Sequence, residues 1–155
     1  AMQSKYPHRK MRKSEQGQGL VEFALAITLL LFMLAGTIDL GRAFFTYMAM
    51  RDAAQEGASF AVINAMNGTA IEQRAKTTTT PAAGSSSVLA VNLNIDDVKV
   101  LTEVTGFPCA GSPVKVTVTY ENFPLFFPFS NVIFGNNFIR LSTSVTDTIL
   151  LPACE

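Results

Sequence analysis

The side chains most often used in catalysis are scarce in this sequence and are not grouped. The only histidine, His8, lies in a basic stretch near the start, so a Ser-His-Asp or Cys-His arrangement cannot be built further along the chain. A phosphate-binding glycine loop, a G-x-S-x-G segment and an acidic metal cluster are also missing, and the lone pair Asp96-Asp97 is typical of a solvated turn. We therefore expect no enzymatic activity, no cofactor, no metal and no small-molecule substrate.

The two cysteines could bind a metal or form a disulfide. Cys109 and Cys154 lie 45 positions apart, without the close pairs that zinc sites use. If this part of the chain is exported, the two residues are expected to form a disulfide. The alternative is two unrelated buried thiols.

Glu22 is the only formal charge in an apolar segment that runs from Leu20 to Ile38. At ~1.5 Å per residue this segment spans about 28 Å, close to the ~30 Å hydrocarbon thickness of a bilayer. It predicts a transmembrane helix. A carboxylate there costs about 2.5–3.5 kcal/mol at the bilayer centre, less near the interface, and tends to be kept for a purpose. Glu22 therefore either guides assembly with other subunits or snorkels to the headgroups.

The residues before the apolar segment are strongly basic, although the formal net charge of the whole chain is zero. Such a cluster keeps its side of a membrane helix in the cytoplasm, here with the side chains Lys5, Arg9, Lys10, Arg12 and Lys13. We expect residues 1–17 to be a basic cytoplasmic leader and residues 18–38 to cross the cytoplasmic membrane once. The later positive charges are scattered, which argues against nucleic acid as a partner. A cleavable secretory signal is the alternative, but its apolar core would be shorter.

Helical periodicity continues over residues 39–66, the expected exported part of the same helix. Apolar side chains recur there mostly every three or four residues, at Leu40, Phe44, Tyr47, Met48, Ala54, Ala58 and Ala61. This stripe packs either on the rest of the chain or on other copies. Within residues 67–87, Thr69 and Glu72 predict a capping box for a short second helix near residues 70–76, followed by a linker.

The period changes to two in residues 88–155, which indicates an antiparallel β domain. The expected strands are Val88–Asn94, Val98–Thr105, Val114–Glu121 and Phe138–Leu150. The fold class is thus α+β, with a sheet of about four strands packed on the long helix. Pairing Val116 with Asp147 and Val118 with Val145 would bring the two cysteines opposite each other.

The segment Asn122–Asn137, between the last two expected strands, holds five of the 12 phenylalanines and two prolines. Its prolines argue against the interior of a sheet. A long apolar loop of this kind is either folded back as core or exposed for contact with a membrane or a partner.

The residues Gly17-Gln18-Gly19-Leu20-Val21-Glu22 resemble a type IV prepilin processing site, where a membrane peptidase cuts after a glycine and a glutamate is fifth in the mature chain. A cut after Gly17 makes Gln18 the first residue and Glu22 the fifth, whereas a cut after Gly19 would place Ala24 there. Glu22 of one subunit would then neutralise the N-terminus of its neighbour.

The wider stretch from Glu15 to Val62 resembles the TadE-like family of pilus assembly proteins of tight-adherence systems. The resemblance lies in the opening G-Q-x-L-V-E-F-A, the step I-D-x-G-R at Ile38–Arg42 and the block A-A-x-E-G-A at Ala53–Ala58. It implies a bacterial minor pilin or pseudopilin, anchored in the cytoplasmic membrane with its C-terminal domain outside, that works with other pilin subunits and the assembly machinery of thin adhesive pili. It also implies processing by a prepilin peptidase, although family members vary in this. Thr28 stands where a proline is common, which predicts a less kinked helix.

Three other functions fit parts of the sequence. A membrane-tethered binding or adhesion module would use the sheet or the phenylalanine-rich loop without entering a filament. A secreted protein would lose its first forty or so residues as a signal. A small hydrolase is the least supported, because its catalytic residue types are not assembled.

Overall fold

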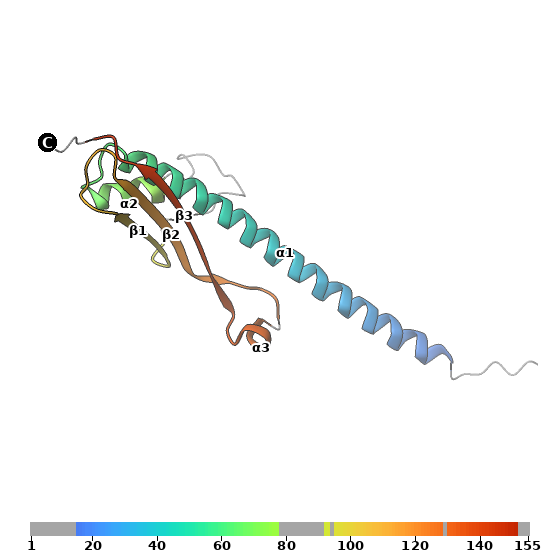
Figure 1. The fold of residues 1–155 in the computed structure, drawn as a ribbon. Helices are drawn as coiled ribbons and strands as arrows, with labels where there is room; N and C mark the ends of the chain where they lie inside the picture. Colours follow the sequence, from blue (N-terminus) through green and yellow to red (C-terminus); the bar gives the residue numbers. More distant parts are fainter. Residues whose placement is uncertain (1–14, 78–91, 94, 129, 152–155) are drawn as a thin grey trace, which may run out of the picture.

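The computed structural model describes residues 15–77, 92–93, 95–128 and 130–151. In this part of the chain one very long helix is followed by a short helix and a sheet, in the α+β arrangement expected (Figure 1). The elements are α1 (Glu15–Ala61), α2 (Gly68–Thr77), β1 (Val98–Val104), β2 (Pro113–Pro124), α3 (Ser130–Phe134) and β3 (Phe138–Thr148).

Helix α1 runs unbroken for 47 residues, and its N-terminal half projects beyond the sheet (Figure 1). From Gly17 onward it is long and apolar enough to cross a membrane, with a mean hydropathy of 2.2 over its most apolar window, none of which is buried within the chain. The helix ends at Ala61, earlier than the expected end near Met66. The carbonyl of Val62 instead accepts the backbone N–H of Leu150 at 2.9 Å, so the chain after β3 takes an acceptor that a longer helix would use.

The sheet has three antiparallel strands in the order β1-β2-β3, not about four as expected from the sequence. Most of the first expected strand, Val88–Asn94, lies outside the described residues. Its described members Asn92 and Leu93 belong to no strand, and the Leu93 side chain is buried in the core instead.

The register of β2 and β3 differs by two residues from the one inferred from the cysteines. Val116 pairs with Val145, and Val118 pairs with Thr143. A shift of two residues leaves every side chain on its expected face of the sheet, so the alternating pattern cannot detect it. Cys154 lies outside the described residues, and its pairing with Cys109 stays a prediction.

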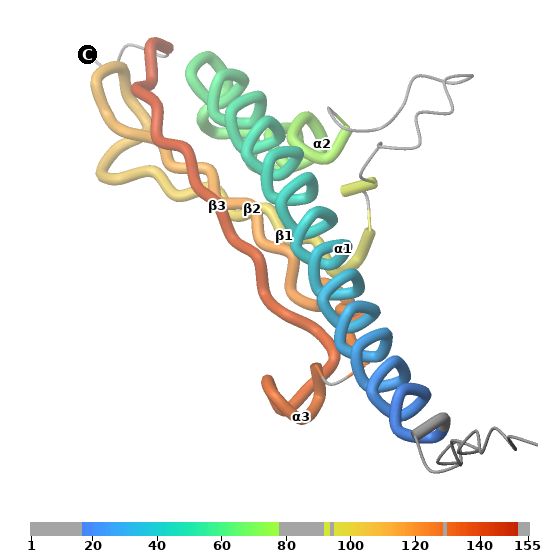
Figure 2. Tube along the Cα trace, turned by 90° about the vertical axis from the view of Figure 1, so that its right-hand side faces the viewer, coloured from blue at the N-terminus to red at the C-terminus, as the bar shows by residue number. Residues whose placement is uncertain are grey.

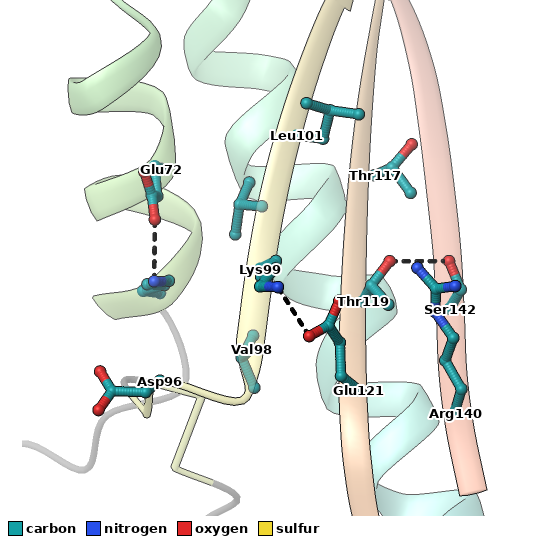
Figure 3. A pocket seen from close by; sticks show the side chains of 12 residues that line it. Glu72, Asp96, Val98, Lys99, Leu101, Thr117, Thr119, Glu121, Arg140 and Ser142 are labelled. Carbon is teal, nitrogen blue, oxygen red and sulfur yellow. Dashed lines mark hydrogen bonds and ion pairs between the residues drawn. The ribbon is translucent and has the colours of Figure 1, made fainter.

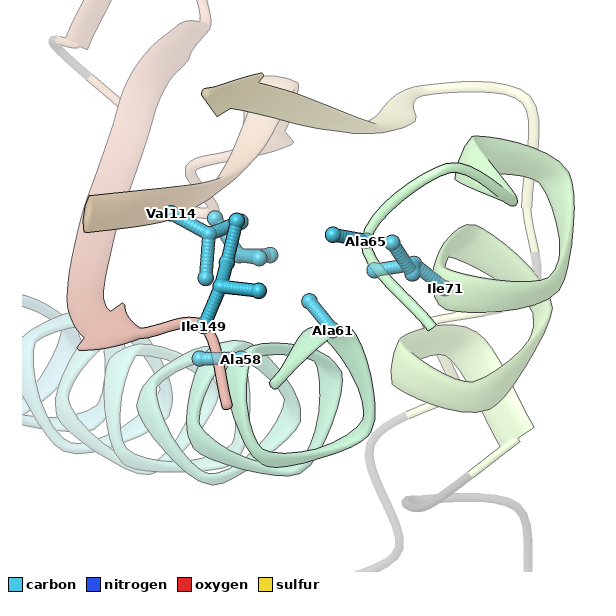
Figure 4. Close-up of a cluster of buried hydrophobic side chains, with 7 residues drawn as sticks. Ala58, Ala61, Ala65, Ile71, Val114 and Ile149 are labelled. Carbon is cyan, nitrogen blue, oxygen red and sulfur yellow. The ribbon is translucent and has the colours of Figure 1, made fainter. Parts of the chain in front are cut away.

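The core fills the space between α1, α2 and one face of the sheet. Figure 4 shows Ala58 and Ala61 of α1 against Val114, Ile149 and Ile71. Small side chains on α1 allow its backbone to approach the valines of β2, which are fully buried. The expected apolar stripe of α1 is therefore divided: Ala54, Ala58 and Ala61 belong to the core, whereas Leu40, Phe44, Tyr47 and Met48 stay exposed.

Helix α2 begins with a different cap from the one expected. The Asn67 side chain accepts the backbone N–H of Ala70 at 3.2 Å, which makes Asn67 the N-cap. The prediction of a capping box formed by Thr69 and Glu72 is therefore wrong. Glu72 forms an ion pair with Lys76 one turn later, at 2.8 Å.

The hairpin of β2 and β3 extends along α1 toward the N-terminal half of that helix, and its end carries α3 (Figure 2). The register shifts by one residue between Tyr120 and Phe123, which is an irregularity of the bulge type. After it, the Phe123 side chain is buried and lies edge-on to Tyr120, with ring centroids 5.6 Å apart. We call residues 125–128 and 130–137 the hairpin tip.

Candidate functional site

The three residues predicted to act at the N-terminus lie in the first turns of α1. Gly17, Gln18 and Glu22 are all exposed, and nothing lies within 4 Å of the place where a side chain on Gly17 would begin. The carboxylate of Glu22 has no ion-pair partner among the described residues. This end of the helix is thus accessible, and its processing and assembly roles stay predictions.

The hydroxyl groups within the apolar segment are satisfied by the helix itself. Thr28 Oγ1 donates to the carbonyl of Ala24 at 2.7 Å, and Thr37 Oγ1 donates to that of Met33 at 2.8 Å. Such bonds to the preceding turn let a threonine enter hydrocarbon without an unpaired polar group. Both threonines of the segment therefore have a hydrogen-bond acceptor within the helix, and Glu22 is its one charged side chain.

Asp39 marks the end of the apolar segment and joins α1 to the hairpin tip. Its side chain is only 6% exposed. The carboxylate accepts the backbone N–H of Phe126 at 2.9 Å and that of Phe127 at 2.7 Å. Hydrogen bonds to an ionised acceptor are stronger than neutral ones, and two adjacent donors fix the direction of the chain. One side chain of the helix therefore holds the hairpin tip.

Arg42, one turn further along α1, completes this contact. Its Nη1 lies 3.5 Å from Asp39 Oδ1 and donates to the carbonyl of Pro124 at 3.4 Å. The guanidinium lies over the ring of Phe126, at 4.4 Å from the centroid, and over that of Phe123, at 5.3 Å. These are distances for cation–π contacts. We call the two residues the Asp39–Arg42 clamp.

Beyond the clamp, the hairpin tip packs on the apolar segment itself. The rings of Phe127 and Phe32 meet edge to face, with centroids 6.3 Å apart. An apolar groove of about 390 Å³ runs between α1 and the tip. Its walls come from Gly36, Leu40 and Ala43 on the helix and from Leu125, Ile133 and Phe134 on the tip.

A second contact site lies near the C-terminal end of α1. A Cβ on Gly57 would meet Ala75 Cβ and Val116 Cγ1 at 3.2 Å each, so the glycine lets α1 approach both α2 and β2 more closely than most side chains would allow. Next to it, Glu56 accepts a hydrogen bond from Arg74 Nε at 2.7 Å. The block Ala53–Ala58 thus joins the helix to the sheet and to α2.

Both contact sites fall within the match to one known family. Residues 17–59 match the model of the family described as TadE-like protein. This segment is TadE-like. The match confirms the resemblance that the motifs indicated, covers less than half of the chain and ends before α2 and the sheet. No curated protein and no solved structure gives a significant match to the chain.

Two of the TadE-like motifs contact different parts of the structure. The step at Ile38–Arg42 holds the hairpin tip, and the block at Ala53–Ala58 holds the sheet and α2. Sequence reasoning treated Asp39 and Arg42 only as family markers. Their spacing of three residues on one helix face, directly after the apolar segment, is the signal that could have indicated a joint role.

A polar hollow of about 590 Å³ is lined by α2 and the three strands (Figure 3). Its charges are largely paired, because Lys99 Nζ lies 2.7 Å from Glu121 Oε2 and Lys76 is paired with Glu72. The hydroxyl groups of Thr119 and Ser142 are also bonded to each other, at 3.1 Å. The described residues include no group of three His, Cys, Asp or Glu side chains that could hold a metal ion. We assign no ligand to this hollow.

Proposed function

We propose that this chain is a structural subunit, a minor pilin or pseudopilin, used to assemble Tad-type adhesive pili. The observation that carries the proposal is the TadE-like match over residues 17–59, which includes both the apolar segment and its continuation along the sheet. The role needs an anchor and contact surfaces rather than catalytic groups, so we propose no enzymatic activity.

The proposed topology places α1 across the cytoplasmic membrane and the sheet on its outer side. The basic cluster before residue 14 supports this direction, since Lys and Arg are retained on the cytoplasmic side. Asp39 and Arg42 then lie where α1 leaves the hydrocarbon, which suits two charged side chains. The sheet and α2 lie outside the membrane.

An exposed apolar stripe on α1 supports assembly with other subunits. Phe44 is 58% exposed, and Tyr47 and Met48 continue the same line. These residues flank the face that packs on the sheet, so the domain leaves them uncovered. A stripe of this kind at helical spacing is typical of helix-to-helix contact. We propose that the helices of other pilin subunits cover it.

Glu22 provides the proposed means of alignment. A cut after Gly17 by a prepilin peptidase would leave the α-amino group of Gln18 one turn away from this carboxylate. In the low dielectric of a membrane, an unpaired carboxylate is costly and an opposite charge at short range is strongly favoured. Each Glu22 would therefore neutralise the N-terminus of a neighbouring subunit.

The test is complementation of cells that lack their own copy of the gene. We expect the Glu22→Ala variant to reach normal levels in the membrane and to restore few or no pili, as counted by electron microscopy. The control is Glu103→Ala, which removes an exposed carboxylate from the sheet and should restore pili fully. Normal pilus numbers with Glu22→Ala would favour the other candidate, a membrane-tethered adhesion module outside the filament.

A further inference from the structure

We infer that the hairpin tip is inserted into the outer leaflet of the membrane that α1 crosses, with lipid acyl chains as its partner. This makes the hairpin a second, shallow membrane contact beside the transmembrane helix. The inference rests on the proposed membrane anchor but not on entry into a pilus.

The first support is the position of the tip along α1. Its Phe127 ring packs on Phe32, which lies inside the apolar segment. Phe32 precedes Asp39 by seven residues, which is about 10 Å along a helix axis. If the segment up to Ile38 lies in hydrocarbon, then the part of the tip against Phe32 lies at hydrocarbon depth as well. Insertion by about 5–10 Å is usual for segments that bind at the membrane interface.

The second support is the apolar surface that the tip exposes. Phe126, Val132, Ile133 and Phe134 are exposed by 71%, 82%, 62% and 58% respectively. No charged residue occurs between Glu121 and Arg140. Several large apolar side chains exposed within one short uncharged segment are unusual on a protein that faces only water.

The third support is that the tip pairs much of its own backbone, as a segment in lipid must. Asp39 accepts the N–H groups of Phe126 and Phe127. The N–H of Leu125 donates to the carbonyl of Asn137 at 2.8 Å, that of Ser130 to Phe127 at 3.0 Å and that of Gly135 to Asn131 at 3.0 Å. The buried Ser130 hydroxyl donates to the side chain of Asn137 at 3.0 Å. Membrane insertion would therefore not require these groups to lose their partners.

Lipid is a better occupant of this surface than a second protein, because the surface is continuous with the apolar segment. One wall of the groove beside the tip is formed by Gly36 and Leu40 of α1 itself. The lipid around α1 thus meets the tip without any further binding step.

The experiment uses tryptophan as a depth probe, since the chain contains none. Phe134→Trp places the probe on the tip, and Ile133→Trp gives a second reading from the same turn. Phe23→Trp is the control within the apolar segment. Phe107→Trp, on a phenylalanine that is 83% exposed between β1 and β2, is the control outside the membrane. The full chain is reconstituted in vesicles of phosphatidylethanolamine and phosphatidylglycerol, with or without bromine on the acyl chains.

We expect brominated lipid to remove most of the emission of Phe134→Trp and Ile133→Trp, as it does for Phe23→Trp, and to leave that of Phe107→Trp unchanged. Emission from both tip probes that matches Phe107→Trp while Phe23→Trp is quenched would overturn the inference and keep the anchor. Blue-shifted tip emission that bromine does not quench would show that protein and not lipid covers the tip, and it would overturn the inference too. Unquenched Phe23→Trp would overturn the anchor and the inference together.

Discussion

The carboxylate of Asp39 accepts the backbone N–H of Phe127, a residue 88 positions later in the chain, at 2.7 Å. This bond joins the end of the apolar segment to the far end of the β2–β3 hairpin. Together with the bond from the N–H of Phe126 and the contacts of Arg42, it gives the attachment of the hairpin tip to α1 a direction, which apolar side-chain contacts alone do not supply. The position of the tip along α1 therefore depends on the Asp39–Arg42 clamp.

Asp39→Asn should loosen the hairpin tip. An amide has one acceptor oxygen where the carboxylate has two, and it carries no charge, so the bonds to Phe126 and Phe127 weaken. We expect a loss of about 1–3 kcal/mol in the local free energy of opening. Hydrogen exchange at those two amides, measured in detergent micelles, would report it. Asp52→Asn changes an exposed residue of the same helix and should leave the exchange rates as they are. Unchanged protection in Asp39→Asn would contradict the clamp.

Arg42→Lys tests the aromatic part of the clamp. An ammonium group keeps the charge but lacks the planar face that lies over Phe126. The Arg42 side chain is 37% exposed, so we expect a small loss of unfolding free energy, about 0.5–1 kcal/mol. Thermal unfolding of the purified chain in detergent would measure it, with Arg51→Lys on an exposed position as the control. Equal unfolding temperatures for the two variants would argue against the cation–π contacts.

Gly57→Val should disturb the packing of α1 on the sheet. Its Cβ alone would meet Ala75 and Val116 at 3.2 Å, and valine adds two methyl groups to that Cβ. We expect a cost of about 1–3 kcal/mol in the free energy of unfolding, measured by denaturant titration. Gly41→Val introduces the same β-branched residue into the same helix at a position with nothing within 4 Å. A similar cost for both variants would mean that helix propensity, not packing, sets the effect.

Processing can be tested at the two neighbouring glycines. Co-expression with a prepilin peptidase should give a mature chain that begins at Gln18, as seen by N-terminal sequencing. Gly17→Val should block this product, because the proposed cut follows that residue. Gly19→Val should leave it intact. A product that begins at Leu20 would instead show that the cut follows Gly19.

Much of the fold follows from local patterns in the sequence. The apolar segment, its helical continuation, the short second helix and the three strands of the sheet all show in residue periodicity, because each depends on residues that are near one another in the chain. The resemblance to the TadE-like family was also evident in short motifs such as Ile38–Arg42. Local patterns predicted the ends of the helices less accurately. The choice of Asn67 over Thr69 as the cap of α2, and the end of α1 at Ala61, depend on how neighbouring segments meet.

By itself, the sequence determined that one long apolar helix leads into an α+β domain, since composition and periodicity are properties of contiguous residues. Only the tertiary structure decided where the phenylalanine-rich loop lies, which part of the helix stripe is buried, and how β2 and β3 are registered. Those features depend on contacts between residues tens of positions apart. A two-residue shift in register keeps the same faces of the strands, and a loop without charges fits either water-exposed or buried settings. The contact between Asp39 and the backbone of Phe126 and Phe127 helps to hold this loop on the helix, and no local pattern contains it.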